Sequence, residues 1–340
     1  MKVTSSKITI VVPFRNILGN TESVDPSFRA LLHSLEIVSL NVEEIIFVND
    51  HSTDASVEFL SKCSIQNLLV LNLNDDFTGK KAGLELGVNA AKTEYIWTID
   101  SDVEVSGFHV EQFQRFQSSL KAELVILPVR MKSKVGVLNI LQSLEWRYLQ
   151  FLTWSSARLK MPMMCNGANL VFKRELFLEN IESHRTISSG DDMFLLSHVL
   201  KSKGKIEMCW ETFGVVEIAP VSSWIEAIAQ RVRWAGKTIQ LPITKSTFFH
   251  ALFTLVSALH LLALMGLFEP SLHLLCAYFL MSKVLVEVLC MRSIFSIRMS
   301  GMETIVAFPQ MLLYPVFSLV IFISSLFFKP KWKGRRVSLK

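Results

Sequence analysis

The first 240 residues of the chain alternate short apolar runs with segments whose apolar residues recur at helical spacing. The runs are seven or eight residues long and are apolar at successive positions, as expected for strands buried on both faces. Strands of this kind, separated by helices, are typical of a mostly parallel sheet with helices on each side. We therefore predict an α/β domain over residues 1–240. Its strands are expected at residues 8–14, 43–50, 67–73 and 94–100, and two of its helices at residues 27–40 and 54–63.

Polar side chains stand where three of the predicted strands end. Asn16 follows the first strand, and Asp50 closes the second. The fourth strand runs into Asp100 and Asp102. In open α/β sheets ligands bind outside the carboxyl ends of the strands. The aspartate pair has two interpretations: a solvated turn with Asx-type hydrogen bonds, or a site for a hard cation such as Mg²⁺ or Mn²⁺, which carboxylate oxygens suit.

The pattern changes after about residue 245, where three long apolar segments follow one another. They span residues 248–268, 271–291 and 304–328. About 20 apolar residues cross the hydrocarbon core of a bilayer, so we predict a transmembrane region over residues 246–328. Within it, Lys283 and Glu287 are four residues apart and can pair on one helix face. The alternative is a set of buried core helices, but three such segments in a row are unusual in a soluble core.

An amphipathic segment precedes the apolar region. Residues 221–237 place four apolar residues on one helical stripe: Trp224, Ile225, Ile228 and Val232. This pattern is typical of an interfacial helix on the cytosolic leaflet. An ordinary amphipathic core helix explains it equally well.

A basic tail, residues 329–340, follows the apolar region and bears on topology. It holds six Lys or Arg residues, which the positive-inside rule places in the cytosol. Three full spans leading from a cytosolic domain put the tail on the opposite side. We therefore expect the third apolar segment, which contains Pro309 and Pro315, to be re-entrant or kinked.

Composition supports a membrane-associated enzyme and disfavours other classes. The 340 residues are 50% hydrophobic with a mean hydropathy of +0.37, which is high for a purely soluble enzyme. The net charge of +5 suits an anionic membrane surface or phosphate-bearing ligands. The sequence contains no run of alternating basic and aromatic residues of the kind that would indicate a nucleic-acid partner. Five scattered cysteines without Cys-x-x-Cys indicate reduced thiols in a cytosolic domain. Neither a Gly-x-Gly-x-x-Gly nor a P-loop motif is present.

Further polar stretches lie near the ends of predicted elements. They are VPFRN (12–16) with VNDHSTD (48–54), GKKAGLELG (79–87), SSGDDMFLL (188–196) and QRVRW (230–234). Each alone has an ordinary explanation, such as surface lysines or a helix N-cap. Lys80 and Lys81 are nevertheless suited to binding phosphates. Gln230, Arg233 and Trp234 are spaced i, i+3 and i+4, so one helix face can present all three.

Taken in order, these stretches resemble the family 2 glycosyltransferases of GT-A fold, in the membrane-embedded branch that includes cellulose, chitin and hyaluronan synthases and some lipid glycosyltransferases. The resemblance covers most of the chain. It implies an inverting transfer of a hexose or N-acetylhexosamine from a UDP-sugar with the help of Mg²⁺ or Mn²⁺. Two positions depart from the family pattern: Asp191-Asp192 replaces the usual Glu-Asp, and Glu85 stands where the family has Asn.

The resemblance also implies a role for each matching residue. Donor binding falls to Pro13, Asn16, Asp50, Lys80, Asp100 and Asp102, and the metal to Asp102 with Asp100. The general base is Asp192 by position, with Asp191 as the alternative. Diphosphate and acceptor contacts fall to Gln230, Arg233, Trp234, Asn166 and Gly167.

The acceptor and the location stay open at this stage. The acceptor is expected to be a polysaccharide or a lipid-linked glycan. Transfer of a single sugar to a membrane lipid, such as a carotenoid, a polyprenyl phosphate or a glycolipid, is the alternative, and a catalytically silent nucleotide-binding scaffold is an alternative of another class. We expect a multi-pass protein of the cell membrane, a bacterial inner membrane, with a cytosolic catalytic domain.

Overall fold

The computed structural model describes residues 7–18, 24–106, 110–132, 135–181, 190–209, 214–238, 240–293, 299–328, 331–332 and 335–336. The chain divides into two compact units. We call Met1–Arg130 with Met164–Ala219 the α/β unit, and Met131–Met163 with Pro220–Leu339 the helical unit.

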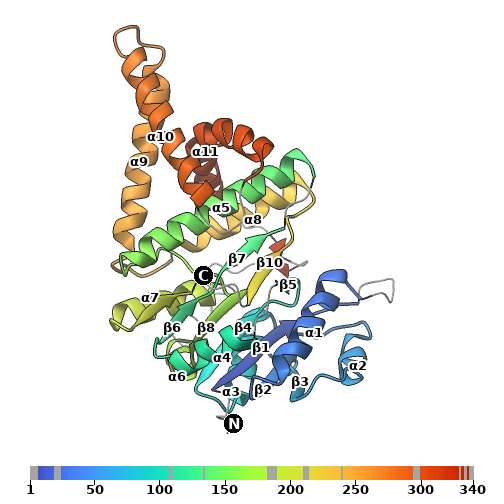
Figure 1. Ribbon diagram of the computed structural model, residues 1–340. Helices are drawn as coiled ribbons and strands as arrows, with labels where there is room; N and C mark the ends of the chain where they lie inside the picture. Colours follow the sequence, from blue (N-terminus) through green and yellow to red (C-terminus); the bar gives the residue numbers. More distant parts are fainter. Residues whose placement is uncertain are drawn as a thin grey trace. The chain divides into compact units, whose positions relative to one another are not determined.

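Seven strands of the α/β unit form one mixed sheet in the order β3-β2-β1-β4-β8-β6-β9 (Figure 1). Their bounds are β1 Ile8–Phe14, β2 Glu44–Asn49, β3 Leu68–Asn72, β4 Tyr95–Ile99, β6 Leu124–Ile126, β8 Asn169–Lys173 and β9 Ile206–Met208. Strands β1 to β4 are mutually parallel, β6 and β9 are parallel, and β8 is antiparallel to β4 and β6. The four predicted strands are confirmed to within one residue at each end, and the mixed, mostly parallel sheet confirms the predicted α/β class.

A second, three-stranded sheet has the order β5-β10-β7. Its strands are β5 Val103–Ser106, β10 Val215–Ile218 and β7 Val129–Met131. The helices of the α/β unit are α1 Pro26–Ser39, α2 Ser56–Ser61, α3 Lys80–Ala90, α4 Val110–Ser119, α6 Arg174–Ile181 and α7 Asp191–Lys201. Both predicted helices are present as α1 and α2. Helix α1 begins at a side-chain cap, because the Asp25 carboxylate accepts the Ser27 N–H at 2.8 Å.

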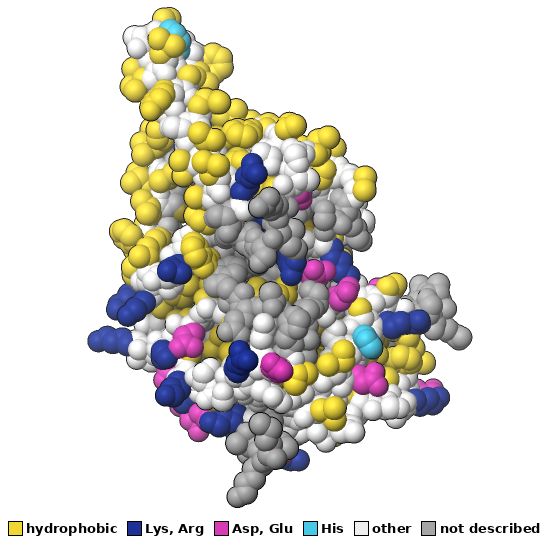
Figure 2. All heavy atoms as spheres, in the orientation of Figure 1, with side chains coloured by type: hydrophobic (Ala, Val, Ile, Leu, Met, Phe, Trp, Pro, Cys, Tyr) yellow, Lys and Arg dark blue, Asp and Glu magenta, His cyan; other side chains and the backbone are white. Residues whose placement is uncertain are grey.

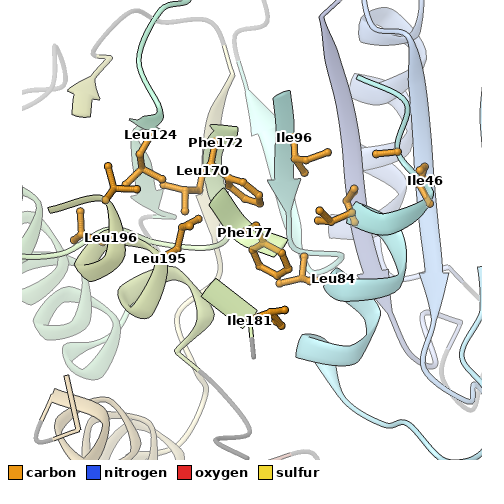
Figure 3. Close-up of a cluster of buried hydrophobic side chains, with 14 of the residues drawn as sticks. Ile46, Leu84, Ile96, Leu124, Leu170, Phe172, Phe177, Ile181, Leu195 and Leu196 are labelled. Carbon is orange, nitrogen blue, oxygen red and sulfur yellow. The ribbon is translucent and has the colours of Figure 1, made fainter. Parts of the chain in front are cut away.

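Helices cover both faces of the main sheet, which explains why its strands are apolar at successive positions. On one face α3, α6 and α7 enclose a buried cluster that includes Ile96, Phe172 and Leu195 (Figure 3). On the other face the Phe47 ring packs against Phe28 of α1, with 5.9 Å between ring centroids. Residues on both sides of these strands are therefore buried, and most of them are apolar.

Helix α3 lies unusually close to β1 and β2, and Gly87 makes that approach possible. A Cβ atom at Gly87 would lie 2.5 Å from Val11 Cγ1 and 3.2 Å from Val48 Cγ2. Both valines are fully buried, so neither can move aside without disturbing the core. The close packing brings the first turn of α3 to the carboxyl ends of the strands.

We expect Gly87→Ala to lower the free energy of unfolding by about 1–3 kcal/mol, because an overpacked core must shift side chains or backbone. Gly301→Ala is the matched control, since a Cβ at Gly301, the first residue of a helix, meets no atom within 4 Å. Thermal unfolding of the purified variants in one detergent checks this. Equal midpoints for both variants would contradict the packing argument.

Five helices make up the main part of the helical unit. They are α5 Val137–Arg158, α8 Trp224–Thr238, α9 Thr247–Gly266, α10 His273–Ser293 and α11 Gly301–Phe327, and the short strands β11 Lys331–Trp332 and β12 Arg335–Arg336 follow. Helices α9, α10 and α11 are each long and apolar enough to cross a membrane. Figure 2 shows hydrophobic side chains over most of the visible surface of α9 and α10. The expected pair between Lys283 and Glu287 is confirmed, with 2.7 Å between Nζ and Oε1.

Packing within the helical unit refines three expectations. Helices α5 and α8 pack against the apolar helices, so this compact unit starts before residue 240. Helix α11 continues through Pro309 and Pro315 without a break, so of the two expected forms, re-entrant or kinked, only a kink stays a prediction. In α8, Trp224 and Ile225 are exposed as expected for an interfacial stripe, but Val232 is buried. The apolar surface of α8 is therefore confined to its first turns.

Candidate active site

The carboxyl edge of the main sheet carries the first group of predicted residues. The strands lie in the order β2-β1-β4. Asp50 directly follows β2, and Asp100 directly follows β4. Asn16 comes two residues after the end of β1, and Pro13 is the second-to-last residue of β1. Because these strands are parallel, their ends share one edge of the sheet, where ligands of open α/β sheets bind.

The loops after β1 and β2 hold each other in place. Asn16 has a left-handed backbone with φ of +50°, and its Oδ1 accepts the Thr53 N–H at 2.8 Å. Its own N–H donates to Ser52 Oγ at 2.9 Å. Asp50 is buried, with 6% of its surface exposed, and its N–H donates to the Phe14 carbonyl at 2.9 Å. These hydrogen bonds hold the two loops in a defined arrangement beside the ends of β1 and β2.

Lys80, the first residue of α3, pairs with Asp100 at the end of β4 and is attracted by the carboxylates at the start of α7. Its ammonium group donates to a carboxylate oxygen of Asp100, and both side chains are partly buried. Burial alone would lower the pKa of Lys80, but attraction by Asp100, and then by Asp192 and Asp191, outweighs burial and raises that pKa. Lys80 is therefore a cation at neutral pH, paired with Asp100 and within reach of the charges of Asp191 and Asp192.

The two adjacent aspartates of α7 stand in different surroundings. Gly190 precedes them with a left-handed φ of +99°, which turns the chain into the helix. Asp191 is buried and pairs with Lys81, with 3.4 Å between Oδ1 and Nζ and only 8% of each side chain exposed. Lys81, expected beside a phosphate, is thus held by Asp191 instead. Asp192 is only partly buried. Of the two carboxylates, Asp192 is the one that solvent and a ligand can reach.

The segment before β8 contributes a hydrogen bond to the Asp192 carboxylate. The Gly167 N–H donates to Asp192 Oδ2 at 3.0 Å, and the Met193 N–H donates to Oδ1 at 2.9 Å. Asn166 Oδ1 accepts the Ala168 N–H at 2.9 Å, which shapes the turn. These bonds hold the Asp192 carboxylate in one orientation. The structure therefore brings together Gly167 and Asp192, which the sequence assigned to acceptor binding and catalysis.

Cys165 lies beside Asp192 but is not suited to nucleophilic chemistry. Its thiol donates to the main-chain oxygen of Asp192 at 3.2 Å. Burial, and then the charge of Asp192, raise the pKa of this thiol well above its usual range. The group stays protonated at neutral pH, which leaves Asp192 as the reactive side chain here.

Asp100 and Asp102 flank the turn between β4 and β5, and Asp102 is exposed. Among the described residues no group of three or more His, Cys, Asp or Glu side chains is arranged to hold a metal ion. The donor set nevertheless fits a cation that takes one or two ligands from protein carboxylates and the rest from water and substrate phosphates, as Mg²⁺ usually does.

The remaining predicted residues belong to the helical unit. Gln230, Arg233 and Trp234 lie on α8, and all three are partly buried. Between them, Arg231 is buried and donates from Nε and Nη2 to Oε2 of Glu145 on α5, at 2.9 and 2.6 Å. The sequence analysis missed both members of this pair. A charged residue four positions after Ala227, on the buried side of α8, was the available signal.

These features define the class of protein. A mostly parallel sheet with charged side chains gathered at its carboxyl edge is the architecture of α/β enzymes that bind a ligand at that edge. The sequence model of the family described as Glycosyl transferase family 2 matches residues 9–179, which is just over half of the chain. The chain belongs to glycosyl transferase family 2 and is a glycosyltransferase, and the expected GT-A fold class is confirmed.

Individual relatives are distant. Glycosyltransferase GlyA of Streptococcus pneumoniae serotype 4 is 28% identical over 120 residues, which cover 35% of this chain and 16% of that protein. The S. aureus TarS 1-349 structure in complex with UDP-GlcNAc has a TM-score of 0.46 and 13% identity, covering 98% of this chain and 97% of that chain. GalNAc-T7 with UDP, GalNAc and Mn²⁺ also has a TM-score of 0.46, with 14% identity, 64% of this chain and 44% of that chain covered. These structures are too distant to identify a donor or metal for this chain.

Proposed function

We propose that the protein is a membrane-bound, metal-dependent, inverting glycosyltransferase that moves a hexose or N-acetylhexosamine from a UDP-sugar to a polysaccharide or lipid-linked acceptor. One observation carries the proposal. Lys80 pairs with Asp100, at the end of β4, and is attracted by the charges of the two carboxylates that begin α7. Groups that bind a diphosphate and a group that accepts a proton are thereby gathered at one edge of the sheet.

The proposed reaction is a direct displacement at the anomeric carbon of the donor sugar. Asp192 takes the proton of an acceptor hydroxyl as that oxygen bonds to the anomeric carbon. The bond between this carbon and the diphosphate oxygen breaks, and UDP leaves with the electron pair. Positioned general-base catalysis of this kind contributes about 10²- to 10⁴-fold. Asp192 suits the role because two N–H groups orient its carboxylate.

The leaving diphosphate needs cationic groups around it. Lys80 supplies one charge, and Arg233 of α8 supplies a second with a planar fork that matches phosphate oxygens. A divalent cation held by Asp102 and Asp100 neutralises charge on the diphosphate when it is bound. Asp50, Asn16 and Pro13 then face the nucleoside. The remaining site residues, Asn166, Gly167, Gln230 and Trp234, line the acceptor side.

Membrane attachment follows from the three apolar helices. We place α9, α10 and α11 in the cell membrane and the α/β unit in the cytosol, where nucleotide sugars are made. The exposed Trp224 and Ile225 at the start of α8 suit the headgroup layer.

Turnover of a panel of UDP-sugars by membranes containing the protein tests the proposal, with Mn²⁺, Mg²⁺ or EDTA and extraction of products into organic solvent. We expect cation-dependent release of UDP above that of membranes lacking the protein. Label in the organic phase identifies a lipid acceptor, and label in a polymer identifies a polysaccharide synthase. Absence of turnover with every UDP-sugar would contradict the proposed donor and favour a silent nucleotide-binding scaffold.

A further inference from the structure

A buried ion pair joins α5 to α8 inside the helical unit. Arg231 is 5% exposed and Glu145 is 7% exposed. Two nitrogens of the guanidinium donate to the same oxygen, Glu145 Oε2, at 2.9 and 2.6 Å. A guanidinium withdrawn from water is tolerated only with a charge partner and a full set of acceptors. Glu145 is that charge partner, and it fixes where the Arg231 fork points.

The same guanidinium determines which end of the Gln230 amide faces outward. Arg231 Nη1 donates to Gln230 Oε1 at 2.8 Å, and further to Gln142 Oε1 at 3.4 Å and to the Ala227 carbonyl at 3.3 Å. Arginine has donors and no acceptor, so Gln230 must turn its oxygen toward Arg231. Its NH₂ group is then the end that points away from the guanidinium. An NH₂ group suits the oxygens of a phosphate or a sugar hydroxyl.

Arg231 also holds the ring of Trp234. Its Cζ lies 5.3 Å from the ring centroid, within the range of a cation–π contact. The ring of Trp146, next to Glu145 on α5, packs against Trp234 with 5.9 Å between centroids. The Trp234 ring of α8 is thus held between Arg231, which is bound to Glu145 of α5, and Trp146, which belongs to α5 itself.

We infer that Glu145 and Arg231 are positioning residues for the diphosphate and acceptor face of α8. Glu145 orients Arg231, and Arg231 in turn orients the Gln230 amide and the Trp234 ring. The inference rests on the proposed function, because it takes Gln230 and Trp234 as residues that meet the substrates. Glu145 and Arg231 themselves touch neither substrate.

The test replaces the pair by uncharged side chains of similar size, Glu145→Leu with Arg231→Met. Exchanging a buried ion pair for well-packed apolar residues often leaves stability unchanged, whereas removing one partner does not. We expect the KM values for donor and acceptor to rise about 10-fold or more, as for other residues that orient a ligand-binding group, with a smaller change in kcat. Lys283→Met with Glu287→Gln is the matched control, since it removes another ion pair of the same unit and keeps an acceptor for the Tyr148 hydroxyl.

A spectroscopic readout separates this inference from the proposed function. Indole rings as close as those of Trp146 and Trp234 couple their electronic transitions, which gives paired bands of opposite sign in ultraviolet circular dichroism. The difference between wild type and Trp146→Phe isolates that signal. We expect the uncharged pair to lose the signal and the control pair to keep it, with or without turnover of any UDP-sugar.

The outcomes are distinct. A wild type without turnover contradicts the proposed function, and the dichroism still decides whether Arg231 positions Trp234. A retained signal, or unchanged KM values in an active enzyme, overturns the inference. If the Glu145→Leu, Arg231→Met variant does not fold, Arg231→Lys replaces it in the test, because lysine keeps the positive charge but lacks the planar guanidinium. It is then expected to show the same loss of signal, and a signal equal to that of wild type would overturn the inference.

Discussion

Replacing Asp192 with asparagine is expected to lower the rate of sugar transfer by about 10²- to 10⁴-fold and to leave UDP binding intact. An amide cannot take the proton of the acceptor hydroxyl. The change is nearly isosteric, so Oδ1 of the new side chain can still accept the N–H of Gly167 or of Met193. The measurement is a comparison of kcat with the dissociation constant for UDP, obtained on the same protein preparation.

Asp191→Asn is the control, because it changes the neighbouring carboxylate with the same chemistry. Asp191 is buried against Lys81, so the change removes the negative charge that faces a buried ammonium. We expect a fall of about 3–5 kcal/mol in the free energy of unfolding and a smaller direct effect on proton transfer. Full transfer activity in Asp192→Asn, or a selective loss of kcat in a stable Asp191→Asn, would exclude Asp192 as the base.

The different surroundings of Asp191 and Asp192 could not be predicted from the sequence. The adjacent aspartates look equivalent in the sequence, and position alone favoured Asp192. Their difference comes from Lys81, 110 residues earlier in the chain, which reaches Asp191 because α3 packs against β1 and β2 at Gly87. Burial set by packing between distant segments leaves no local pattern to read.

Local interactions, in contrast, could be predicted. The four parallel strands were identified because strands buried on both faces are apolar at successive positions. Their carboxyl-end residues followed at once, since parallel strands end at one edge. The pair between Lys283 and Glu287 was predicted because both lie on one helix, four residues apart. Glu145 and Arg231 are 86 residues apart, and their pairing depends on how α5 meets α8.

The second large effect is expected at Asp102. Asp100 already has Lys80 as a charge partner, whereas Asp102 is exposed. A cation that arrives with the donor diphosphate therefore reaches the exposed Asp102 carboxylate at the lower cost in desolvation. We expect Asp102→Ala to weaken binding of UDP in the presence of Mn²⁺ by about 10²-fold, because a metal contact to phosphate oxygens contributes several kcal/mol.

Calorimetric titration of UDP into wild type and Asp102→Ala, with Mn²⁺ and with EDTA, checks this expectation. In wild type EDTA should weaken binding strongly, and in Asp102→Ala it should change little, since the cation is already lost. Glu111→Gln is the control, because it neutralises an exposed carboxylate that pairs with Arg115 on the surface of α4. The same dependence on Mn²⁺ in Asp102→Ala as in wild type would remove Asp102 as a metal ligand. Binding that does not depend on Mn²⁺ in either protein would instead leave Lys80 and Arg233 to carry the charge of the diphosphate without a cation, as a metal-independent transferase would require.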